Sequence, residues 1–275
     1  MIIDTHHHFW NYAPIEFNWI DDDMASIRRN FLPGDLQKTI SGTGVEGVIS
    51  VQARQIVEET DWLLKMASEN EFIKGVVGWL PLASDKIQSL LEKYAANTWL
   101  KGVRHVVQGE PDPEFILGTQ FNRGISLLKE FQLVYDILIF EHQLPNTIRF
   151  VDQHPDQVFV LDHIAKPKIR MNEIQEWGKN LKELAKRENV SCKISGMVTE
   201  ADYKYRTPER LQPYFDTVIE AFGPSRLLFG SDWPVCLVAT GYKDWLSLVQ
   251  MVFGGLSQEE QNQIFYQNAV RIYQL

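Results

Sequence analysis

Residues 1–10 read MIIDTHHHFW, a short apolar run that leads directly into three consecutive histidines. If this run is a β-strand, its side chains alternate between two faces, so that His6 and His8 lie on the same face. Two imidazoles on one face can share a metal ion or hold a polarised substrate oxygen. We therefore expect later segments of the chain to bring partner residues to the end of this strand.

The composition narrows the class of protein. The chain has 275 residues, 44% of them hydrophobic, and a formal net charge of −9. An acidic surface argues against nucleic acid and anionic membranes as partners. The two cysteines, Cys192 and Cys236, fit a reducing compartment. Since no apolar run approaches about 18 residues and no signal peptide is visible, we expect a cytoplasmic protein, and a homo-oligomer stays open.

Apolar runs rich in Val, Ile and Leu alternate with helical patterns along the whole chain. Such runs are typical of parallel strands that are buried on both faces. The eight predicted strands are residues 1–5, 45–51, 74–80, 100–107, 132–140, 157–162, 190–195 and 226–230. A helical pattern follows each of them, and one capping box, Ser257 with Glu260, begins the last helix. The count and the length favour an α/β fold, a single (β/α)8 barrel domain over residues 1–275, rather than a doubly wound sheet.

The chemically useful side chains fall where such a barrel has its active site, at the C-terminal ends of the strands. These residues are His6, His8, Arg104, His105, His142, His163 and Asp232. Strand alternation predicts that His7 points away from His6 and His8. It also predicts that only one of Arg104 and His105 faces the barrel axis, and we favour Arg104.

Four stretches resemble the amidohydrolase superfamily and, within it, the branch of sugar-lactone hydrolases that act on L-fuconolactone and L-rhamnonolactone. They read DTHHHFW (residues 4–10), VLDHIAKP (160–167), SGMVTEAD (195–202) and FGPSRLLFGSDWPVC (222–236). The resemblance implies a distorted (β/α)8 barrel of the amidohydrolase type. The family positions fall on His6, His8, His163 and Asp232. The lysine or glutamate that bridges two metals in the family is not apparent at the end of strand four.

The resemblance implies a hydrolase that opens a sugar-acid lactone, with Asp232 as the general base for water. His163 and His142 are further candidate catalytic residues. One divalent metal, zinc or manganese, would be held by His6, His8, His142 and Asp232. The sequence resembles members of this branch that have one metal ion and members that have none, so the metal content stays open. Without a metal, the histidines would polarise the carbonyl group by hydrogen bonds. The candidate substrate-binding residues are Arg104, Lys166, Trp10, Trp233 and Tyr203.

Three other functions stay open at this point. A metal-dependent decarboxylase or a pyrone-dicarboxylate lactonase of the same superfamily would use the same histidines and aspartate. The third is a barrel that binds a sugar acid without turning it over. A covalent nucleophile is not expected, because the sequence has no G-x-S-x-G motif and neither cysteine has an obvious histidine partner.

Overall fold

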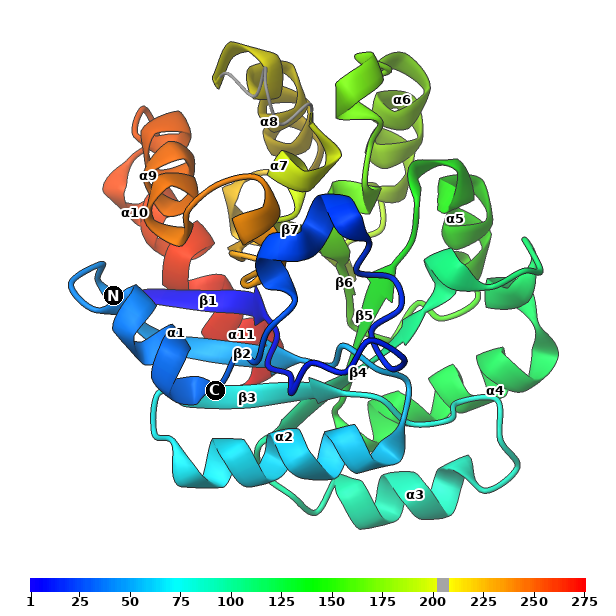
Figure 1. Cartoon of the computed structure of the whole chain (residues 1–275). Helices are drawn as coiled ribbons and strands as arrows, with labels where there is room; N and C mark the ends of the chain where they lie inside the picture. The colour runs from blue at the N-terminus through cyan, green and yellow to red at the C-terminus, as the bar shows by residue number, and fades with distance from the viewer. Residues whose placement is uncertain (202–207) are drawn as a thin grey trace.

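A computed structural model of the chain describes residues 1–201 and 208–275. It contains one eight-stranded sheet in which each strand pairs in parallel with the next along the chain (Figure 1). The strands are β1 (Ile2–His7), β2 (Val45–Val51), β3 (Ile73–Gly78), β4 (Leu100–Val106), β5 (Val134–Leu138), β6 (Phe159–Leu161), β7 (Val190–Ile194) and β8 (Leu227–Phe229). The predicted α/β fold with eight parallel barrel strands is thus confirmed.

The barrel closes just beyond the end of β8. The backbone of Asp232 donates a hydrogen bond to the carbonyl of His6 over 2.7 Å, and His8 donates to the carbonyl of Trp233 over 2.7 Å. An isolated parallel bridge joins His7 to Trp233. The residues that close the barrel are therefore the same residues that carry its candidate chemistry.

Helices surround the sheet and cover its outer face (Figure 1). They are α1 (Pro33–Ile40), α2 (Val57–Glu69), α3 (Ile87–Tyr94), α4 (Thr119–Leu128), α5 (Leu144–Asp152), α6 (Gln175–Leu184), α7 (Met197–Glu200), α8 (Pro208–Phe222), α9 (Tyr242–Phe253), α10 (Gln258–Asn262) and α11 (Asn268–Tyr273). Each long helix buries one apolar stripe, as Trp177, Leu181 and Leu184 do in α6. No described helix is long and apolar enough to cross a membrane.

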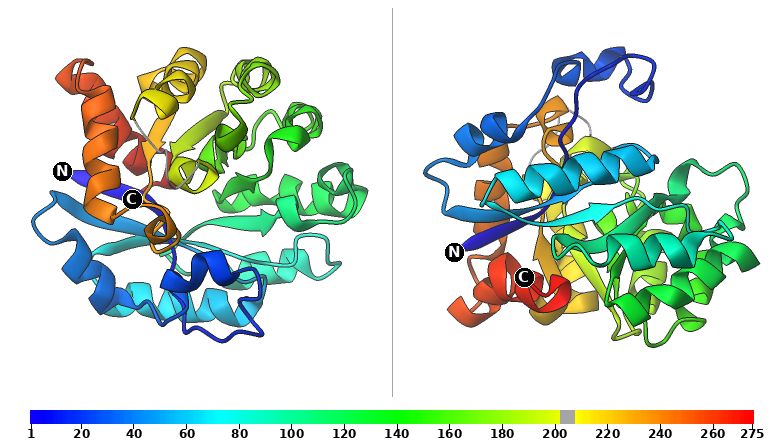
Figure 2. Two further views of the ribbon diagram at one scale, coloured as in Figure 1. Left: turned by 45° about the horizontal axis from the view of Figure 1, so that its top comes forward. Right: turned by 90° about the horizontal axis from the view of Figure 1, so that it is seen from below.

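The two ends of the barrel are closed by different parts of the chain. Inside the sheet, a cluster that includes Ile3, Ile49 and Leu228 packs against Ile272 and Tyr273 of α11. The right view of Figure 2 shows the red C-terminal helices and the dark blue segment that follows β1 at opposite ends of the molecule. The candidate site residues lie at the end where β1 and β8 finish.

The predicted elements differ from the observed ones mainly at their ends. β1 continues to His7, because His7 still pairs with Ser50 of β2. β6 and β8 are shorter than predicted and keep only three residues each. The capping box of Ser257 and Glu260 forms at α10 as predicted.

Candidate active site

Four of the predicted site residues meet at the C-terminal end of the barrel. Nε2 of His6 lies 3.3 Å from Nε2 of His8. A carboxylate oxygen of Asp232 lies 3.4 Å from Nε2 of His8 and 3.8 Å from Nε2 of His6. The ring of His163 lies edge-on to that of His6, with their centroids 4.4 Å apart. All four side chains are buried, so the structure forms a compact, shielded cluster.

The backbone around Asp232 holds this cluster together. Asp232 has a φ of 57°, in the left-handed region that side chains other than glycine rarely adopt. The carboxylate of the buried Asp4 accepts hydrogen bonds from the backbone of Ser231 over 2.8 Å and from the hydroxyl of Tyr242 over 3.0 Å. At Gly230 a Cβ atom would stand 2.8 Å from that of His6. β1 and the end of β8 can therefore approach this closely only because residue 230 is glycine.

His163 is presented by an unusual backbone turn. Residues 163–166 all have positive φ, with values of 52°, 50°, 62° and 46°. Left-handed conformations cost L-residues about 1–2 kcal/mol each, so tertiary contacts must impose this turn. Nδ1 of His163 lies 2.9 Å from the hydroxyl of Ser195. The ring also packs so closely on Gly196 that a Cβ there would lie 2.6 Å from Nδ1.

Burial sets the charge state of the cluster. It lowers the pKa of His6 well below its usual value and lowers the pKa of His163 to about 4. Burial acts to raise the pKa of Asp232, but the nearby His163 and His8 act in the opposite direction, and the net pKa is below the usual value. Near neutral pH the cluster therefore combines the uncharged imidazoles of His6 and His163 with the ionised carboxylate of Asp232.

The same atoms suit a divalent metal ion. Ligand atoms of His6, His8 and Asp232 all lie within 4.8 Å of one another, and so do those of His6, Asp162 and His163. Nδ1 of His8 lies 2.8 Å from the carbonyl of Val51, which only accepts, so Nδ1 carries a hydrogen and Nε2 is the nitrogen that would bind a metal ion. Two imidazoles and a carboxylate form a donor set that zinc accepts. Three of the four predicted metal ligands thus fit such an ion.

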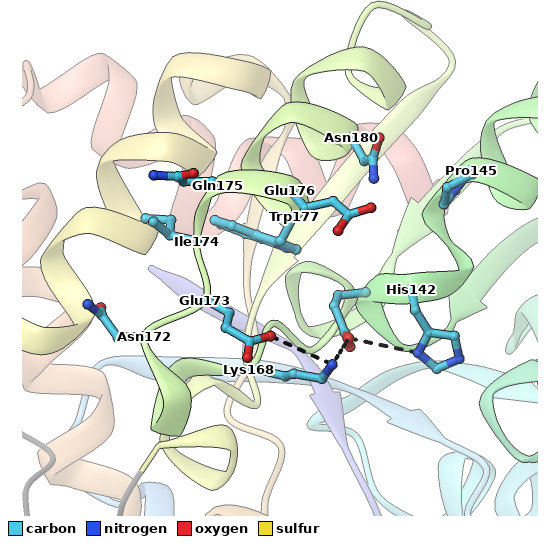
Figure 3. Close-up of a pocket in the computed structure, with 11 residues that line it drawn as sticks. His142, Pro145, Lys168, Asn172, Glu173, Ile174, Gln175, Glu176, Trp177 and Asn180 are labelled. Carbon is cyan, nitrogen blue, oxygen red and sulfur yellow. Dashed lines mark ion pairs between the residues drawn. The ribbon is translucent and has the colours of Figure 1, made fainter.

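The fourth, His142, is a correction to the predicted set. Its side chain is 65% exposed, and its Nδ1 lies 3.8 Å from Glu141. Among the described residues, no group of potential metal ligands includes it. Figure 3 shows His142 beside a cavity of about 630 Å³ that Lys168, Glu173 and other residues outside the cluster line. The chain turns outward after β5, and this geometry supports neither a ligand nor a catalytic role for His142.

Arg104 faces the barrel axis as predicted, but it is bound to other protein groups. It donates to Asp162 over 2.9 Å and to the backbone carbonyl of Gln52, and it lies 3.3 Å from Nε2 of His6. Its side chain is 4% exposed. Arg104 therefore fits a structural charge better than the predicted contact with substrate. His105 points elsewhere, toward Glu110 and Trp79.

The other predicted substrate contacts have different environments. Trp10 and Trp233 are 1% exposed, and Trp10 stacks on His8, so both pack the wall of the cluster rather than present a free face. Lys166 is only partly buried, and its charge influences the pKa of both His163 and Asp232. Tyr203 lies outside the described residues. Lys166 is therefore the predicted substrate contact that this geometry supports best.

Sequence reasoning missed a set of charged residues inside the barrel. Asp136 on β5, Asp162 after β6 and Lys193 on β7 are all fully buried. Lys193 pairs with Asp136 and lies 3.0 Å from Asp162, which lies 3.2 Å from Nδ1 of His6. A usable signal was present, because a charged residue in the middle of VYDIL or VSCKI contradicts an otherwise apolar strand.

Comparisons with known proteins agree with this architecture. The family model described as "Amidohydrolase" matches residues 3–275. An L-fucono-1,5-lactonase of Burkholderia multivorans is 37% identical over 99% of this chain and 96% of its own length. An L-rhamnono-gamma-lactonase of Scheffersomyces stipitis is 24% identical over 64% of this chain and 59% of its own length.

Solved structures give the same result. The crystal structure of a Burkholderia multivorans amidohydrolase with bound zinc superposes with a TM-score of 0.96 at 36% identity, covering 100% of this chain and 99% of the other. A second crystal structure, from Pseudomonas putida, is provisionally named as a 2-pyrone-4,6-dicarboxylic acid hydrolase. It superposes with a TM-score of 0.79 at 19% identity, covering 99% of this chain and 97% of the other, and shows the shared fold alone. The prediction of an amidohydrolase-type enzyme is confirmed, and the chain belongs to the amidohydrolase family.

Proposed function

We propose that this enzyme hydrolyses the lactone of a sugar acid, of the L-fucono-1,5-lactone type. The observation that carries the proposal is the ionised, buried carboxylate of Asp232 beside two imidazoles whose Nε2 atoms lie 3.4 and 3.8 Å away. The relative at 37% identity, named as an L-fucono-1,5-lactonase, supports the substrate class.

Asp232 is the general base in this proposal. A lactone is a cyclic ester, and its hydrolysis adds water to the carbonyl carbon and breaks the bond to the ring oxygen. Asp232 takes one proton from the attacking water, and this proton then passes to the ring oxygen as it leaves. His163, whose ring lies 4.4 Å from that of His6, helps this proton cross the site. The product is the open-chain hydroxy acid.

The carbonyl oxygen of the lactone also needs a positive partner as negative charge develops on it. The Nδ1 hydrogen of His8 is already engaged by the carbonyl of Val51. A divalent zinc or manganese ion held by His6, His8 and Asp232 would supply this polarisation and lower the pKa of bound water. Lys166 brings a further positive charge toward the same cluster.

The other candidate functions receive less support. A pyrone dicarboxylate needs several cationic partners, and Arg104 is already engaged by Asp162 and Gln52. A structural neighbour named as a decarboxylase is 13% identical, which shows the fold alone. A barrel that only binds sugar acids has no need of a shielded carboxylate beside imidazoles.

Lactone hydrolysis measured with a pH indicator tests the proposal. The panel contains 1,4- and 1,5-lactones of fuconate, rhamnonate, galactonate and arabinonate, corrected for spontaneous hydrolysis, with and without added zinc or manganese. We expect turnover of one stereochemical group, and a loss of about 10²- to 10⁴-fold in kcat for Asp232→Asn. Asp85→Asn, a matched change on an 82% exposed side chain, should leave kcat unchanged. An Asp232→Asn enzyme as active as the parent would refute the assigned base.

A further inference from the structure

The first and last strands of the barrel meet at a seam beside the catalytic cluster. Within the described residues β1 and β8 share no backbone ladder, and an isolated bridge between His7 and Trp233 joins the chain just beyond them. Side chains cross the seam as well, since the hydroxyl of Thr5 donates to the carbonyl of Phe229 over 2.7 Å. The position of β1 relative to the turn after β8 therefore depends in part on side-chain hydrogen bonds.

Asp4 makes such a tie next to the proposed base. One of its carboxylate oxygens, Oδ1, accepts a hydrogen bond from the backbone N–H of His6 over 3.1 Å and one from the backbone N–H of Ser231 over 2.8 Å. Ser231 directly precedes Asp232, whose backbone has a φ of 57°. A single oxygen atom therefore joins the backbone of β1 to the turn that carries Asp232.

The carboxylate of Asp4 is itself held from α9. The hydroxyl of Tyr242, the first residue of α9, donates to the second oxygen, Oδ2, over 3.0 Å. Asp4 is 0% and Tyr242 2% exposed, so water is not at hand to replace this hydrogen bond. One turn later on α9, the indole of Trp245 donates to the carbonyl of Gly230 over 2.9 Å. α9 thus contacts the turn after β8 directly through Trp245 and indirectly through Asp4.

We propose that Tyr242 is a positioning residue that acts on Asp232 through Asp4. Its hydroxyl fixes the rotation of the Asp4 carboxylate about the Cβ–Cγ bond, and this carboxylate ties the turn after β8 to β1. Without the hydroxyl, Oδ2 loses a buried donor, and the carboxylate rotates toward other donors. The tie to Ser231 then weakens, and the carboxylate of Asp232 leaves its place 3.4 Å from Nε2 of His8. The kinetic consequence rests on the proposed lactone hydrolysis, whereas the effect on the backbone does not.

Tyr242→Phe is the test variant, because it removes the hydroxyl and keeps the ring. Tyr214→Phe is the matched control. The hydroxyl of Tyr214 is also buried, but it has no hydrogen-bond partner in the part of the chain that the structure describes. Loss of a buried tyrosine hydroxyl is therefore common to both variants, and loss of a hydrogen bond to Asp4 is specific to one of them.

Two measurements are made on the full-length protein. Hydrogen exchange of backbone amides, followed by proton–nitrogen NMR, reports local opening of the turn at Ser231 and Asp232. The amide of Tyr135 on β5, which donates to the carbonyl of Val158 over 3.1 Å, is the internal reference for global unfolding. Steady-state kinetics on the lactone panel, at a temperature at which all variants are folded, report kcat and KM.

In the parent protein we expect both amides of the turn to be protected, because each donates to a buried acceptor. The amide of Ser231 donates to Oδ1 of Asp4 over 2.8 Å, and the amide of Asp232 donates to the carbonyl of His6 over 2.7 Å. An unprotected amide of Ser231 in the parent would overturn the inference before any variant is made.

In Tyr242→Phe we expect exchange at the two amides of the turn to become about 10-fold faster or more relative to the amide of Tyr135, because the tie opens locally. The kcat should fall by about 10- to 100-fold with KM within about twofold, since the variant affects the alignment of the base rather than the binding of substrate. Tyr214→Phe should change neither property.

An unchanged kcat in Tyr242→Phe, whether exchange rises at the turn or at all amides alike, would show that Tyr242 only stabilises the fold and would overturn the positioning role. A fall in kcat without faster exchange at the turn would overturn the route through Asp4. If the parent hydrolyses no lactone, the proposed function fails, and exchange at Ser231 and Asp232 still decides whether Tyr242 holds the turn.

Discussion

Gly196 offers a measurement of how tightly His163 is held. Its φ is +68°, and a Cβ at this position would lie 2.6 Å from Nδ1, 2.8 Å from Cγ and 2.9 Å from Cβ of His163. Gly196→Ala therefore has two costs. The left-handed backbone costs about 1–2 kcal/mol for a residue with a side chain, and overpacking against the buried ring adds about 1–3 kcal/mol. We expect the free energy of unfolding to fall by about 2–5 kcal/mol.

The assay is urea unfolding followed by tryptophan fluorescence, with Gly42→Ala as the matched control. Gly42 has a φ of +75°, and no atom lies within 4 Å of the point where its Cβ would stand, so its replacement measures the backbone cost without the steric cost. The difference between the two variants isolates the contact with His163. The kcat of Gly196→Ala should also fall by about 10- to 100-fold, because the displaced ring leaves the cluster misaligned.

Equal destabilisation by the two replacements would refute the close contact between Gly196 and the ring of His163. A large destabilisation of Gly196→Ala with unchanged kcat would have a different meaning. The contact would then exist, but the position of His163 would not matter to the reaction.

The exposure of His142 and the burial of Asp4 give two further predictions. His142→Ala should change kcat/KM and zinc affinity by no more than about twofold, because the side chain is 65% exposed and lies away from the cluster. Zinc affinity is measured by competition with a chromophoric chelator. A tenfold loss of either quantity would return His142 to the site. Burial raises the pKa of Asp4 from 3.8 to about 6, so the folded protein holds this proton more tightly than the unfolded chain. The contribution of this proton to the free energy of unfolding is complete below the pKa of 3.8 and is lost as the pH rises through the pKa of about 6. The loss amounts to about 3 kcal/mol. In Asp4→Asn, the free energy of unfolding should no longer fall by this amount between about pH 4 and 7. Identical pH profiles of the variant and the parent would contradict the raised pKa of Asp4.

The order of elements was readable from the chain alone. Buried parallel strands are continuous apolar runs, and the run at 45–51 predicts β2 at its observed bounds. The ends were less predictable, because strand ends depend on a partner. β1 reaches His7 only because Ser50 and Trp233 pair with it there. The predicted site residues His6, His8, His163 and Asp232 followed from their positions at strand ends.

The error at His142 has a cause in the backbone. His142 follows β5 as directly as His163 follows β6, and only the backbone path after each strand separates them. After β6 the left-handed turn of residues 163–166 directs His163 inward, whereas His142 points outward to a cavity. Local sequence gives no measure of such a turn, since its cost is met by contacts with Ser195 and Gly196, which follow β7.

The sequence by itself determined the barrel, the family and the residue types of the cluster, because strand periodicity and short motifs are local properties. The tertiary structure alone decided which polar groups are shielded from water and which groups face them. Lys193, Asp136 and Asp162 are far apart in the chain but share the dry interior of the barrel, where each charge must have a partner. That requirement arises only when the strands close, and it places the ion network beneath His6.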